Sequence, residues 1–85
     1  MTAKTKYWID LSDYDLETAI SLLQSRRFLY VAFMCHQSIE KALKAYLTES
    51  SSNAPPYTHS LSHLISKCQL QDLLSNEQSL FLDKL

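Results

Sequence analysis

The sequence predicts an all-α domain, because its 85 residues include no glycine and its apolar residues recur at helical intervals. Without glycine, phosphate-cradling loops, tight turns between strands and dinucleotide fingerprints are all disfavoured. We expect a single domain over residues 1–85. It should contain an antiparallel helical hairpin at about 6–24 and 28–49, completed by two shorter helices into an up-and-down four-helix bundle.

The hairpin follows from a short break between two long periodic segments. Segment 6–24 has acidic residues in its first half, which suits the positive end of a helix dipole. The next three residues, Ser25, Arg26 and Arg27, are too few for a flexible linker, so they should reverse the chain. The two long helices should therefore lie side by side.

The second long helix has two contrasting sides. One carries an apolar stripe at steps of four and three residues, formed by Phe28, Ala32, Cys35, Ile39, Ala42 and Tyr46. We expect this stripe to face the core. Another side carries Gln37, Lys41 and Lys44, with Glu40 four residues before Lys44 in the favourable order for an ion pair. This polar strip should be open to solvent or to a partner.

The C-terminal half should contain a loop and two short helices. Serines, an asparagine and two prolines at 50–56 end the second helix. Ser60 can cap a third helix at about 61–68, and Ser75 with Gln78 forms a capping box for a fourth. The apolar pattern of that helix still runs at Leu85. We therefore expect a shortened domain or a homodimer in which a second copy covers the apolar side.

Composition limits the possible partners and compartments. The formal net charge of -1 disfavours strong nonspecific binding to nucleic acid or anionic membranes. No apolar run is long enough to span a bilayer, so we expect a cytoplasmic protein with no membrane association. Cys35 and Cys68 are expected to be free thiols. We expect no metal, since His59 and His63 lack further ligands at suitable spacing, and no cofactor.

The polar strip is also the strongest candidate site. Two ammonium groups one turn apart, Lys41 and Lys44, beside the amide of Gln37 could engage phosphate oxygens of a nucleotide or RNA. The alternative is that Glu40 and the acidic face of the first helix neutralise them. Sequence spacing leaves both open.

Several motifs resemble the HEPN family of small helical domains. The second helix has that family's Gln-x-x-Glu-Lys-Ala-x-Lys-Ala signature, beginning at Gln37. Tyr7-Trp8, the pattern Asp15-Leu16-Glu17-x-Ala19, and His59-Ser60-Leu61-x-x-Leu64 also agree, although the family usually has His-Asp-Leu at the last of these. The resemblance covers about residues 7–65. It implies structural roles for Glu40 and His59, the latter linking the loop to the hairpin.

Many HEPN domains are ribonucleases with an arginine followed four to six residues later by a histidine. The only arginines here are Arg26 and Arg27, and the next histidine, His36, is ten and nine residues further on. We therefore expect a non-catalytic binding module. The resemblance implies a nucleotidyltransferase partner in a toxin-antitoxin or stress-response pair, contacted by the polar strip or the Arg26-Arg27 turn, or a nucleotide-linked accessory subunit. A metal-independent RNA endonuclease with its site assembled across a dimer, and a purely structural adaptor, are the alternatives.

Overall fold

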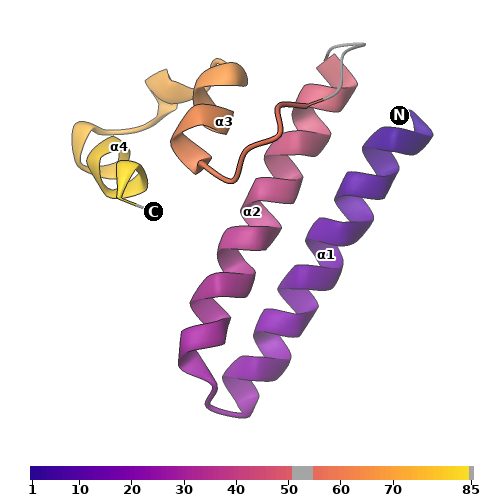
Figure 1. Cartoon of the computed structure of the whole chain (residues 1–85), viewed down its shortest axis with the longest axis vertical. Coiled ribbons are helices and arrows are strands. Elements are labelled where there is room, and N and C mark those ends of the chain that lie inside the picture. Colours follow the sequence, from indigo (N-terminus) through magenta and orange to yellow (C-terminus); the bar gives the residue numbers. More distant parts are fainter. Residues whose placement is uncertain (51–54, 85) are drawn as a thin grey trace.

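The computed structural model describes residues 1–50 and 55–84, and all its regular structure is helical (Figure 1). This confirms the predicted all-α fold and its long hairpin. The predicted loop at 50–56 and the predicted end of the last helix at Leu85 lie partly outside the described residues. The elements, in order, are α1 (Ala3–Gln24), α2 (Phe28–Ser50), α3 (Leu61–Lys67), the 3-10 turn η1 (Gln71–Leu73) and α4 (Asn76–Asp83).

The two short helices lie beside α2, on the side away from α1 (Figure 1). α1 and α2 run antiparallel and contact each other extensively, α3 packs on α2, and α4 packs on α3. Leu61 and Leu64 of α3 are almost completely buried, and so is Cys68 just after it. The Cys68 thiol also lies 3.7 Å from the Leu43 carbonyl oxygen, which accepts its weak hydrogen bond. The apolar core therefore lies mainly where α3 meets α2.

Side-chain caps fix where three helices begin. Thr2 accepts a hydrogen bond from the Thr5 amide, and Ser60 caps α3 through the His63 amide, as predicted. Ser75 and Gln78 form the predicted capping box at the start of α4. Each cap satisfies an amide that has no partner within its helix.

Two helices end in Schellman motifs without glycine. After α1, the Arg26 amide donates to Leu23 and the Arg27 amide donates to Leu22. α3 ends in the same way, with Gln69 at the position equivalent to Arg26. This position requires a positive φ, and Arg26 and Gln69 have φ values of 61° and 60°. Both residues therefore adopt a left-handed conformation in which Cβ is crowded.

The predicted orientation of α2 is wrong. Phe28, Ile39 and Tyr46 of the apolar stripe expose about half or more of their surface, and Ala42 is also exposed. The residues of α2 that are buried are Ser38, Glu40, Lys44 and Ala45. The polar strip thus lies largely inside, and the apolar stripe lies outside.

The reason for this reversal lies on α1. Its buried residues are Thr5, Asp15 and Ala19, which are polar or small. Ser12 and Ser38 bind each other's backbone across the hairpin, with each hydroxyl donating to the other residue's carbonyl oxygen at 2.8 and 2.9 Å. Small side chains allow the helices to approach closely, and polar groups on one helix require partners on the other.

Glycine should stabilise the two left-handed positions. We expect Arg26→Gly and Gln69→Gly each to raise the free energy of unfolding by about 1 kcal/mol, because glycine has no Cβ to crowd the backbone. Urea denaturation measures this change. Arg27→Gly is the matched control and should be neutral or destabilising, since Arg27 has no positive φ. A loss of stability at Gln69 equal to that at Arg27 would contradict this explanation.

Candidate functional site

A short ion pair joins the two long helices beneath the surface. The Lys41 ammonium group lies 2.6 Å from the Asp15 carboxylate, and only 18% and 11% of the two side chains are exposed. Lys41 also lies 3.4 Å from the Gln37 side-chain oxygen. Asp15 comes from α1 and Lys41 from α2, so this pair fixes the register of the hairpin.

Glu40 is the centre of a second buried cluster. It is 1% exposed, and its two carboxylate oxygens have different partners. One accepts from Lys44 at 3.3 Å and the other from His59 Nδ1 at 2.9 Å. The Lys44 ammonium also lies 5.4 Å from the centre of the Trp8 ring of α1, within the range of a cation–π contact. Glu40 thus links α2 to the segment before α3.

His59 is held in one orientation at the edge of a hollow. A carboxylate and a carbonyl oxygen can only accept, so His59 Nδ1 donates to Glu40, and His36 Nε2 donates to the His59 carbonyl oxygen at 3.0 Å. His59 Nε2 therefore remains available, on a side chain that is 74% exposed. The hollow has a volume of about 920 Å³, and we call it the His59 hollow. It is lined by Leu29, Ala32, Phe33, His36, Gln37, His59 and Ser60.

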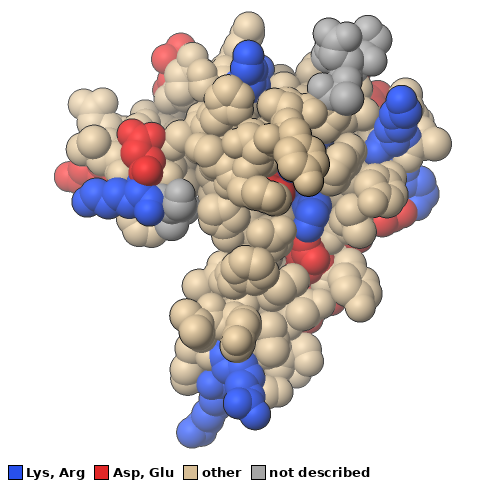
Figure 2. All heavy atoms as spheres, in the orientation of Figure 1, with Lys and Arg blue, Asp and Glu red and all other residues tan. Residues whose placement is uncertain are grey.

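The fold brings together most of the predicted site residues, but not all. Gln37, Lys41 and Lys44 lie along one side of α2, with Glu40 and His59 beside them. The expectation that this strip is open to solvent is wrong for Lys44, which is buried. Arg26 and Arg27 are exposed at the tip of the hairpin, where basic side chains gather in Figure 2. They belong to a separate surface.

Sequence reasoning missed the partners that α1 supplies. Asp15 and Trp8 enter the sequence analysis only as parts of motifs that resemble the family. The useful signal is that Ser12, Asp15 and Ala19 follow one another at steps of three and four, which places them on one side of α1. Two of the three are polar, which points to a polar surface on the facing helix.

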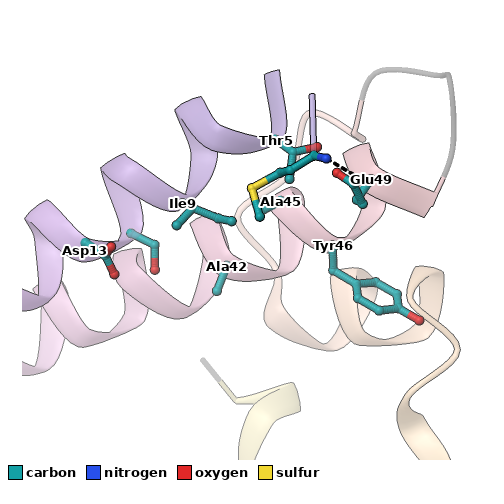
Figure 3. Close-up of a pocket in the computed structure, with 9 residues that line it drawn as sticks. Thr5, Ile9, Asp13, Ala42, Ala45, Tyr46 and Glu49 are labelled. Carbon is teal, nitrogen blue, oxygen red and sulfur yellow. Dashed lines mark ion pairs between the residues drawn. The ribbon is translucent and has the colours of Figure 1, made fainter. Parts of the chain in front are cut away.

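A second hollow lies between the N-terminal end of α1 and the C-terminal end of α2 (Figure 3). We call it the Met1 groove, and its volume is about 540 Å³. Its apolar lining includes Ile9, Ala42 and Tyr46, while Asp13 and Glu49 add carboxylates. The α-ammonium group of Met1 lies 3.7 Å from Glu49, as the dashed line in Figure 3 marks.

The surroundings of two side chains shift their pKa values. A hydrogen bond from Thr5 lowers the pKa of Glu49; desolvation opposes this with a smaller effect, and the positive charge at the N-terminus lowers the pKa further. Burial raises the pKa of the Cys68 thiol, which disfavours the reactive thiolate. Among the residues with described positions, no group of three or more His, Cys, Asp or Glu side chains could hold a metal ion.

The long hairpin, the buried ion network and the short C-terminal helices define a small helical domain of the kind expected from the sequence motifs. The HEPN domain family model matches residues 5–85, nearly the whole chain. The chain therefore belongs to the HEPN domain family. The match extends past residue 65, where the resemblance of individual motifs ends. Comparison with curated proteins and with solved structures finds no match. In the described ranges, no helix is both long and apolar enough to cross a membrane.

Removing the charge of Glu40 should destabilise the fold strongly. We expect Glu40→Gln to lower the free energy of unfolding by about 3 kcal/mol, because it leaves the buried Lys44 ammonium without a carboxylate. Chemical denaturation measures the loss. Lys6 and Asp10 form an exposed pair of the same spacing, 2.9 Å apart, so Asp10→Asn is the matched control. It should cost less than about 0.5 kcal/mol. Equal effects of the two substitutions would contradict the proposed role of burial.

The ionised carboxylate of Glu49 should stabilise the fold near neutral pH but not in acid. Its pKa in the folded state is lowered from its ordinary value of 4.5, so its contribution is fully present above that pH and is lost as the pH falls through the folded-state pKa. Wild type should therefore be more stable than Glu49→Gln at about pH 6, and this difference should shrink as the pH is lowered toward about 3. Urea denaturation at both pH values provides the measurement. A difference that stays constant or grows on acidification would refute the assignment.

Proposed function

We propose that this chain is a non-catalytic HEPN binding module that works as a homodimer. The observation that carries the proposal is the outward-facing apolar stripe of α2, since a small monomer rarely leaves so much contiguous apolar surface in water. A second copy provides the simplest cover, because most soluble oligomers are homo-oligomers with closed symmetry. The exposed surfaces would then serve binding and not catalysis.

The ion network disfavours a strong phosphate-binding site on the polar strip. Lys41 is paired with Asp15, and Lys44 is paired with Glu40. A phosphate would have to compete with these carboxylates for the same ammonium groups. The available polar groups nearby are His59 Nε2 and the Gln37 amide, at the His59 hollow beside Phe33. If the chain is a nucleotide-linked accessory subunit, a nucleotide or RNA phosphate would bind to it at this hollow.

A nucleotidyltransferase is the proposed partner protein, in a toxin-antitoxin or stress-response pair in the cytoplasm. Support comes from the motif resemblance described above and from the exposed basic tip at Arg26 and Arg27, which lies apart from the ion network. Such a tip can contact an acidic surface on another protein. Copurification from the native host tests this part of the proposal, and an Arg26→Ala, Arg27→Ala variant that still recovers the same partner would exclude the tip.

The endonuclease alternative needs an arginine and a histidine in the same site. Arg27 precedes His36 by nine residues, which corresponds to about 14 Å along a helix. Within one chain this separation is too long for both groups to contact one phosphate. Cleavage of labelled RNA by the purified protein, lost in an Arg27→Ala variant, would establish this alternative and overturn the non-catalytic proposal.

The mass of the protein in solution tests dimerisation directly. We expect sedimentation equilibrium at micromolar concentration to give twice the chain mass of 9.8 kDa, because the apolar surface is removed from water only in the dimer. Dilution should shift the average mass toward that of the monomer. A strictly monomeric species across the micromolar range would defeat the proposal.

A further inference from the structure

Among the three histidines of the chain, His59 is the one whose ring contacts a carboxylate in the described structure. Its Nδ1 lies 2.9 Å from an oxygen of Glu40, a side chain that is 1% exposed. The ring of His36 contacts a backbone carbonyl oxygen instead, and His63 lies on the exposed side of α3. The surroundings of His59 therefore differ from those of the other two imidazoles.

The contact with Glu40 fixes the tautomer of the His59 ring. A neutral imidazole has one N–H group and one lone pair, on different nitrogen atoms. Because the carboxylate accepts the hydrogen of Nδ1, the lone pair belongs to Nε2. The side chain is largely exposed, so an incoming molecule can reach this lone pair. His59 Nε2 is therefore an accessible nucleophile.

Glu40 also favours attack by this nitrogen. When an imidazole forms a new bond through Nε2, positive charge develops on its ring. A carboxylate that accepts from Nδ1 stabilises this charge, as the buried aspartate of a catalytic triad does for its histidine. Lys44 contacts the second oxygen of Glu40 and so holds the carboxylate in place. The pair of Glu40 and His59 thus has the arrangement of an activated nucleophile.

The His59 hollow suits an electrophile that carries several oxygens. The residues that line it, given above, include no aspartate or glutamate that would repel an anion. The side-chain oxygen of Gln37 accepts from Lys41, which leaves the N–H groups of Gln37 to donate. The Ser60 hydroxyl can also donate while it accepts from the His63 amide. A phosphoryl group has three acceptor oxygens for such donors, whereas an acyl group has one and a metal ion needs ligands.

We propose that His59 is a phosphoryl-acceptor residue, which attacks a small phosphoryl donor through Nε2 and carries the phosphoryl group at the His59 hollow. The Nε2 lone pair forms the new N–P bond. The bond from phosphorus to the leaving group breaks, and its electron pair goes to the leaving group. The ring becomes a phosphorylated imidazolium whose Nδ1–H still donates to Glu40. Of the apolar stripe of α2, only Ala32 also lines the hollow, so this role does not depend on the proposed dimer.

Reaction with phosphoramidate tests this assignment. In this donor the nitrogen leaves as ammonia, so the transfer is balanced without another reactant. We expect folded wild type to gain a phosphoryl group at His59 at least about tenfold faster than at His63, because Glu40 activates only the former. Mass spectrometry of peptides kept at alkaline pH, where phosphohistidine survives, measures both rates. Equal rates at the two histidines would overturn the proposal.

Matched substitutions and unfolding separate the effect of the fold from that of the local sequence. His59→Gln should lose the fast reaction, whereas the control His63→Gln, four residues further on, should keep it. In concentrated urea, where the contact with Glu40 is lost, the two histidines of wild type should react at similar rates. A preference for His59 that persists in urea would overturn the role assigned to Glu40.

The nitrogen that carries the phosphoryl group gives an independent readout. Because the Nδ1 hydrogen is held by Glu40, phosphorus should be found on Nε2 of His59, as phosphorus–proton NMR correlation can show. Before reaction, nitrogen NMR at about pH 9, where imidazoles are neutral, should find the ring hydrogen on Nδ1. A product on Nδ1, a ring hydrogen on Nε2, or folded wild type that gains no phosphoryl group would each contradict the proposal.

Discussion

Two buried carboxylates, Asp15 and Glu40, decide which side of α2 faces the rest of the domain. Asp15 pairs with Lys41 across the hairpin, and Glu40 joins Lys44 to His59. A buried charge without a partner is costly, so each carboxylate requires the cation that meets it. Within the described ranges every buried side-chain nitrogen and oxygen has a hydrogen-bond partner. Once these pairs form inside, the apolar stripe of α2 can only face outward.

This arrangement connects stability to binding. Few large side chains are fully buried, and those in α3, Leu61 and Leu64, lie on the other side of α2 from the hairpin interior. A domain of this size buries a smaller fraction of its surface on folding than a larger domain does, so it has little stability to spare. A partner that covers the exposed apolar stripe of α2 would add the hydrophobic burial that the single chain lacks. Association would then serve stability and function through the same surface.

The sequence predicts local structure well because local signals determine it. The ends of α1 and α2, the short turn between them, and the Ser60 and Ser75 caps all follow from residues within a few positions of each other. The orientation of α2 depends on a different helix. Periodicity within α2 identifies an apolar and a polar side, but Ser12, Asp15 and Trp8 of α1 determine which side is inside. The sequence therefore identifies polar residues of α2 that lie together, but it does not reveal that they are largely buried.

The coupling energy between Asp15 and Lys41 tests this account most directly. A double-mutant cycle compares the unfolding free energies of wild type, Asp15→Ala, Lys41→Ala and the double variant. If the pair lies inside and orients α2, the coupling should exceed about 1.5 kcal/mol, and the double variant should be more stable than the sum of the single losses implies. A coupling below about 0.5 kcal/mol, the range of exposed surface pairs, would contradict the orientation of α2 described above.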